Sequence, residues 1–134
     1  MLPENNGTKK SPINAITIDG LDIKKGSALS GGTTEYHDET LPWFYQYGMG
    51  VYEKINNCFD AGNLSVYITH INSLKNAAAY IGAVKLSEAA QTLESAVDLG
   101  DFSFIESTNK RFLITLKQLL CNINNALSSR DKKD

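Results

Sequence analysis

The sequence has few of the residues that form metal centres and disulfides. Its 134 residues include only two cysteines and two histidines. Cys58 and Cys121 stand far apart without a C-x-x-C spacing, so we expect reduced core thiols, with a disulfide as the alternative. His37 and His70 lack the ligand spacing of a zinc site. We therefore expect no metal and no cofactor.

Long apolar runs and an excess of one charge are also missing. No stretch approaches the roughly 18 apolar residues of a membrane span, and the first ten residues lack the apolar core of a signal peptide. The formal net charge is only -2, which gives no electrostatic reason to expect nucleic acid or an anionic membrane as partner. We expect a cytoplasmic chain without direct membrane contact.

What the sequence does contain is helical periodicity. Apolar residues recur at helical spacing over about 33–61, 65–83, 86–99 and 102–127, and a shorter helix is predicted over 22–29. No alternating apolar and polar run requires a sheet, so the predicted fold is all-α, an antiparallel four-helix bundle with a short N-terminal helix. The predicted organisation is a linker or disordered start over 1–15, the bundle over 16–128 and a polar tail over 129–134.

The segment 33–61 is the least regular of the four. Thr33 or Thr34 can cap it, and Pro42 should kink or split its first part. Glycines inside the segment, Gly48 among them, should loosen the second part. The segment also holds a cluster of aromatic residues that we expect in the core rather than in a binding box: Trp43, Phe44, Tyr45 and Tyr47.

The segment 65–83 organises the rest of the chain. It has an apolar face at helical spacing, formed by Ile71, Leu74, Ala78 and Ile81. A turn of about 100° per residue places Asn72 opposite that face. Beside it are other short or small residues that let a partner's backbone approach closely, with one cation on the edge: Asn76, Ala79, Ala83 and Lys75.

The residues I-N-S-L-K-N-A-A-A-Y-I-G-A resemble the signature helix of histidine-containing phosphotransfer (HPt) domains, H-x-L-K-(G/S)-x-x-x-x-(I/L)-G. Leu74, Lys75, Ile81 and Gly82 match that pattern. The family pattern L-x-x-x-A-x-x-L-E-x-A-x-x-x-G-D is matched over residues 86–101, and the resemblance covers roughly residues 16–125. It implies a phosphorelay module, found at the end of hybrid sensor histidine kinases, that docks response-regulator receiver domains.

The resemblance implies docking through Asn72, Lys75, Asn76, Ala79 and Ala83, with a sensor histidine kinase as a further partner. It also implies that Asn72 stands at the position of the phosphorylated histidine. An amide nitrogen, whose lone pair is delocalised into the carbonyl, cannot act as the nucleophile, so we predict an inactive acceptor. In relatives the lysine offsets phosphoryl charge; an ordinary solvated lysine is the open alternative.

Two other possibilities stay open. His70 lies about 200° around the helix from Asn72, so it is expected half-buried on the flank of the apolar face rather than as a substitute acceptor. The chain can alternatively be a helical regulatory or dimerisation module that binds a kinase or other helices without chemistry, using an aromatic patch over 43–52. A shielded Trp43 would speak against that patch. We do not expect an enzyme in the ordinary sense.

Overall fold

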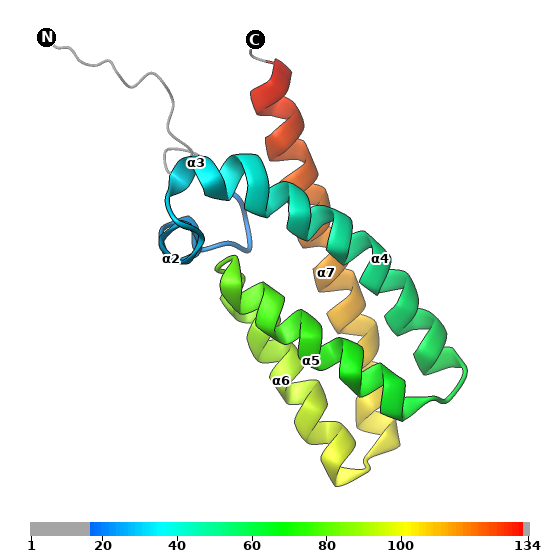
Figure 1. Cartoon of the computed structure of the whole chain (residues 1–134). Helices are drawn as coiled ribbons and strands as arrows, with labels where there is room; N and C mark the ends of the chain where they lie inside the picture. Colours follow the sequence, from blue (N-terminus) through cyan, green and yellow to red (C-terminus); the bar gives the residue numbers. More distant parts are fainter. Residues whose placement is uncertain (1–16, 133–134) are drawn as a thin grey trace, which may run out of the picture.

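The computed structural model describes residues 17–132, and the regular secondary structure of this part is all helical, without a strand (Figure 1). The predicted linker over 1–15 lies outside the described residues. The all-α prediction is confirmed. The elements in chain order are α2 (Ile23–Ser30), α3 (Thr33–Glu35), the π-helical turn η2 (Tyr36–Thr40), α4 (Leu41–Asp60), α5 (Leu64–Tyr80), α6 (Val84–Leu99) and α7 (Phe102–Lys132).

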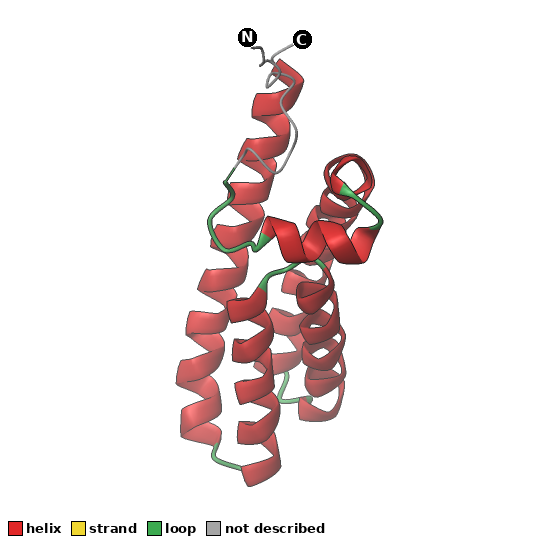
Figure 2. Ribbon diagram, turned by 90° about the vertical axis from the view of Figure 1, so that its left-hand side faces the viewer, coloured by secondary structure: helices red, strands yellow, loops and turns green. Residues whose placement is uncertain are grey.

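The four long helices α4, α5, α6 and α7 lie side by side and alternate in direction (Figures 1 and 2). Helices α4 and α6 each pack against both α5 and α7, so every long helix has two neighbours. This packing is compatible with the predicted antiparallel bundle. The short helix α2 lies across one end of it (Figure 2), where the Asp22 N–H donates to the Gly82 carbonyl oxygen at 2.8 Å.

The core lies between the long helices and contains the predicted apolar face of α5. Ile71, Leu74, Ala78 and Ile81 are all fully buried, together with residues of the other three long helices such as Ile55, Leu93 and Leu116. Burying such side chains is the main favourable contribution to folding. The core therefore fixes which face of α5 points away from the bundle.

Pro42 does not split the segment from Thr33 to Asp60. The chain continues from α3 through the π-helical turn η2 into α4, with Pro42 in the first turn of α4. A proline removes one helical N–H and its ring crowds the preceding turn, and a wider π turn at this point accommodates both effects. The N-cap is Gly32, so the predicted capping by Thr33 or Thr34 is wrong.

Gly48 brings α4 close to α7. A Cβ atom at this buried position would lie 2.6 Å from Cδ2 of Leu120, which is closer than real Cβ contacts allow. Gly48 therefore serves helix packing, and α4 continues unbroken to Asp60 rather than loosening there.

The C-terminal helix is longer than predicted. Helix α7 runs to Lys132, so helical structure extends past the predicted boundary at residue 128 into the expected polar tail. Arginine and lysine have good helix propensity, and the run S-S-R-D-K contains no proline or glycine that would end the helix. None of the helices in the described part of the chain is both long and apolar enough to cross a membrane.

Candidate functional site

The exposed side of α5 carries Asn72, Asn76 and Ala79, which we call the docking strip. All three are exposed, and the strip contains no charged residue. The helix starts at Leu64, directly after the N-cap Asn63, whose side chain accepts a hydrogen bond from the Val66 N–H at 3.3 Å. The predicted orientation of these three side chains is confirmed.

Ala83 does not belong to this surface. It is completely buried and stands at the N-cap of α6. Helix α5 ends at Tyr80 because Gly82 adopts a left-handed conformation with φ of +84°, and the Ala83 N–H folds back to the Ala78 carbonyl oxygen at 2.8 Å. A helical wheel continued past this turn therefore placed Ala83 on the wrong side, and its predicted role in docking is wrong.

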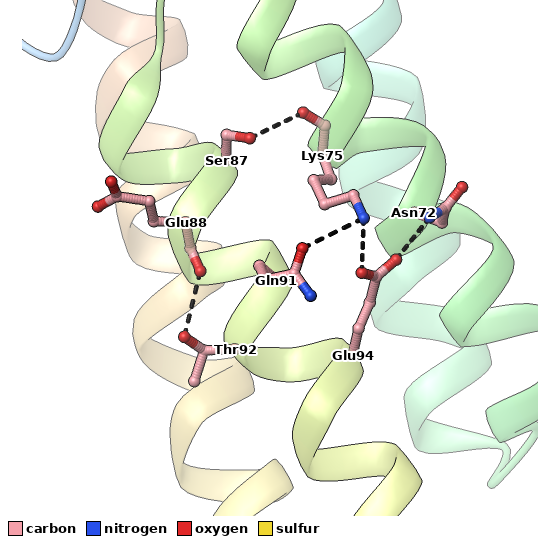
Figure 3. A network of polar contacts seen from close by, with 7 residues as sticks. All are labelled: Asn72, Lys75, Ser87, Glu88, Gln91, Thr92 and Glu94. Carbon is pink, nitrogen blue, oxygen red and sulfur yellow. Dashed lines mark hydrogen bonds and ion pairs between the residues drawn. The ribbon is translucent and has the colours of Figure 1, made fainter.

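Glu94 on α6 connects the two polar side chains of α5 at this site (Figure 3). Its Oε2 accepts from Nδ2 of Asn72 at 2.6 Å, and its Oε1 accepts from Nζ of Lys75 at 2.8 Å. Nζ of Lys75 also donates to Oε1 of Gln91 at 3.4 Å. The amide and the ammonium are thus both held by one carboxylate, so Lys75 is ion-paired rather than freely solvated.

This role of Glu94, which lies within the family pattern matched over residues 86–101, was not predicted from the sequence. The signal in the sequence that could have indicated this role is the charge pattern. Lys75 is the one residue of α5 that carries a full charge at neutral pH, and a half-buried lysine side chain favours an acidic partner on the neighbouring helix. The relative rotation of α5 and α6 decides which acidic residue of α6 faces Lys75. Only the structure gives that rotation.

The surroundings of Glu94 set its pKa. Partial burial by itself raises the pKa of this carboxyl, but the hydrogen bonds from Lys75 and Asn72 and the positive charge of Lys75 outweigh it. The pKa of Glu94 is therefore held below its ordinary value, and the group is a carboxylate throughout the neutral range.

We expect Glu94→Gln to lower the free energy of unfolding at pH 7 by about 0.5–1 kcal/mol. A carboxyl whose folded pKa is depressed stabilises the fold above its unfolded pKa of about 4.3, and the contribution disappears as the pH falls through the folded pKa. The difference between wild type and variant, measured by urea unfolding, should therefore shrink below pH 4. Glu88→Gln on the same helix is the control, and an equal effect there would contradict the pairing.

The two histidines lie on different elements. His70 is half-buried on α5, as predicted, and makes no side-chain hydrogen bond within the described chain. His37 is buried in η2, with Nδ1 3.0 Å from Oδ1 of Asp38. The described residues contain no cluster of potential metal ligands. Cys58 and Cys121 are both free, and Cys121 is exposed, so its predicted place in the core is wrong.

Trp43, Tyr47 and Tyr80 form an aromatic patch next to the docking strip. Trp43 is 47% exposed, so its predicted burial is wrong, whereas Phe44 is fully buried as expected. The Trp43 ring stacks on Tyr47 with centroids 5.6 Å apart and meets Tyr80 edge-on at 6.4 Å. The Tyr47 hydroxyl donates to Oγ of Ser73 at 2.9 Å, which ties the patch to α5.

Asn72, Lys75 and Glu94 are therefore the polar centre of a largely uncharged surface, with the aromatic patch on its α4 side. The arrangement supplies no nucleophile at residue 72. No protein-family model, curated protein or solved structure matches this chain.

Proposed function

We propose that this chain is an HPt-like four-helix module of a two-component phosphorelay, which docks a receiver domain through the docking strip without carrying the phosphoryl group. The observation that carries this proposal is the exposure of Asn72 at the position where the motif places the acceptor histidine. Short, uncharged neighbours along the same strip let a partner helix approach closely, as small residues do at helix contacts.

The lack of phosphotransfer chemistry follows from the side chains at the site. The Asn72 amide donates its N–H to Glu94 at 2.6 Å, and its nitrogen has no lone pair available for attack. Lys75, which would offset phosphoryl charge, is already paired with the same carboxylate at 2.8 Å. His70 projects from the flank of the buried face, about 200° around α5 from Asn72. We therefore propose docking alone as the activity.

Ala79→Arg should weaken receiver binding strongly, because a long charged side chain would stand on the strip that has to approach the partner. Ala28→Arg is the matched control, since Ala28 is also exposed on a helix but belongs to α2. Calorimetric titration with a receiver from the same organism should show a loss of at least about 10-fold in affinity for the first variant only. Equal affinities for the two variants would contradict docking through the strip.

A second candidate function is favoured by the exposure of Trp43. Exposed aromatic side chains that cluster on one surface commonly mark contacts with a partner. Through the aromatic patch the chain would act as a regulatory module that binds a helix of a kinase or another protein. The same titration separates the candidates, because a partner held by the patch is lost with Trp43→Ala and retained with Ala79→Arg.

A further inference from the structure

We infer that this chain binds the unphosphorylated form of its receiver partner in preference to the phosphorylated form. The inference rests on the proposed receiver docking and adds the state of the partner. It follows from the way in which Asn72, Lys75 and Glu94 are joined.

The first step concerns the available positive charge. Lys75 is the one fully charged residue along α5, and its Nζ lies 2.8 Å from Oε1 of Glu94. The pair is largely shielded from solvent, with side-chain exposures of 22% and 15%. An ammonium in such a pair already makes a charge-assisted hydrogen bond with the carboxylate, which is the strongest interaction available to it. Among the described residues of the site, none therefore offers a free cation to an incoming anion.

The second step concerns negative charge. The other oxygen of Glu94 is 2.6 Å from Nδ2 of Asn72, so a carboxylate stands directly behind the residue that a phosphoryl group would approach. Helix α6 carries two further acidic residues, Glu88 and Asp98, against one lysine, Lys85. The surface made by α5 and α6 is thus neutral to slightly acidic around residue 72.

The third step compares the two forms of the partner. A phosphoryl group carries up to two negative charges near pH 7. Placed against Asn72, it would meet a carboxylate without a nucleophile or a free ammonium, and juxtaposed like charges are an effective way to reject a partner. The unphosphorylated partner avoids this repulsion. The chain would then hold receivers that have not yet been phosphorylated, or have lost the group.

The test measures the affinity of the wild-type chain for one receiver in two forms, unmodified and loaded with beryllofluoride and Mg²⁺ as a stable acyl-phosphate mimic. We expect the unmodified receiver to bind about 10-fold more tightly. Glu94→Gln removes the carboxylate and frees Lys75, and it should bring the two affinities together or reverse their order.

Glu88→Gln is the matched control, because it makes the same change of charge on α6 without touching Asn72 or Lys75, and it should shift the ratio of the two affinities less than Glu94→Gln does. Only the Glu88 backbone carbonyl oxygen takes part in a contact of Figure 3, accepting from the Thr92 hydroxyl at 3.1 Å. Equal or tighter binding of the loaded receiver by the wild type would overturn the inference, and so would equal shifts in the two variants. Binding of neither form would instead refute receiver docking itself.

Discussion

Asn72→His should convert the chain into a phosphoryl acceptor. With a phosphorylated receiver as donor, we expect the initial rate of labelling to rise by at least about 10³-fold over the parent chain, since the variant supplies the missing nucleophile. The bond between phosphorus and the receiver's aspartate oxygen breaks as a bond from phosphorus to imidazole nitrogen forms. The measurement is acid-labile radioactive phosphate on the purified variant.

Glu94 is the reason to expect that this single change is sufficient. Its Oε2 already accepts a hydrogen bond from residue 72 at 2.6 Å. An imidazole there can donate its Nδ1–H to the same oxygen, which fixes the tautomer and leaves the Nε2 lone pair directed outward. At saturating concentrations of phosphorylated receiver, where affinity no longer limits the rate, Glu94→Gln in the histidine background should therefore slow labelling without abolishing it.

Two controls make the phosphotransfer result decisive. Asn72→Gln keeps an amide at the site and should stay unlabelled, whereas the double variant with Asn72→His and His70→Ala should keep the label. If the double variant lost the label, the phosphoryl acceptor would be His70 rather than the histidine introduced at position 72. An unlabelled Asn72→His chain that still binds the receiver would show that the site does not support the chemistry.

Local patterns in the sequence predicted much of the fold. The apolar face of α5 follows helical spacing, and its four residues are all fully buried. The helices expected over 22–29 and 86–99 end where Gly31 and Gly100, both in the left-handed conformation, terminate α2 and α6. Signals of this kind depend on a few neighbouring residues, so a single sequence carries them.

The errors at Trp43 and Glu94 concern contacts between different helices, whereas the error at Ala83 is a local one. Ala83 was placed by extending a helix past a turn whose hydrogen bonds begin the next element. Trp43 has an apolar side chain, but the rotation of α4 against the bundle leaves it at the surface beside Tyr80. Glu94 reaches Lys75 only because α5 and α6 pack with one particular rotation. Helix periodicity does not determine that rotation.

Gly82→Ala should be the most destabilising small substitution at the end of the bundle that holds α2. Gly82 has φ of +84°, and an added Cβ would lie 2.3 Å from the Asp22 carbonyl oxygen. The left-handed conformation alone costs a residue with a side chain about 1–2 kcal/mol. Moving α2 away to relieve the collision weakens the hydrogen bond from the Asp22 N–H to Gly82, worth about another 1 kcal/mol.

We therefore expect Gly82→Ala to lower the free energy of unfolding by about 3 kcal/mol and the melting temperature by roughly 10 °C. Gly50→Ala is the matched control, because Gly50 lies in α4 with open space around its Cβ position and should be stabilised by about 0.5–1 kcal/mol. Opposite signs for the same glycine-to-alanine change would show that the tight contact of α2 with the turn after α5 holds this end of the bundle. If both variants were more stable than the wild type in thermal unfolding, the tight contact between α2 and Gly82 would be contradicted. The left-handed Gly82 would then also fail to explain why α5 ends before Ala83.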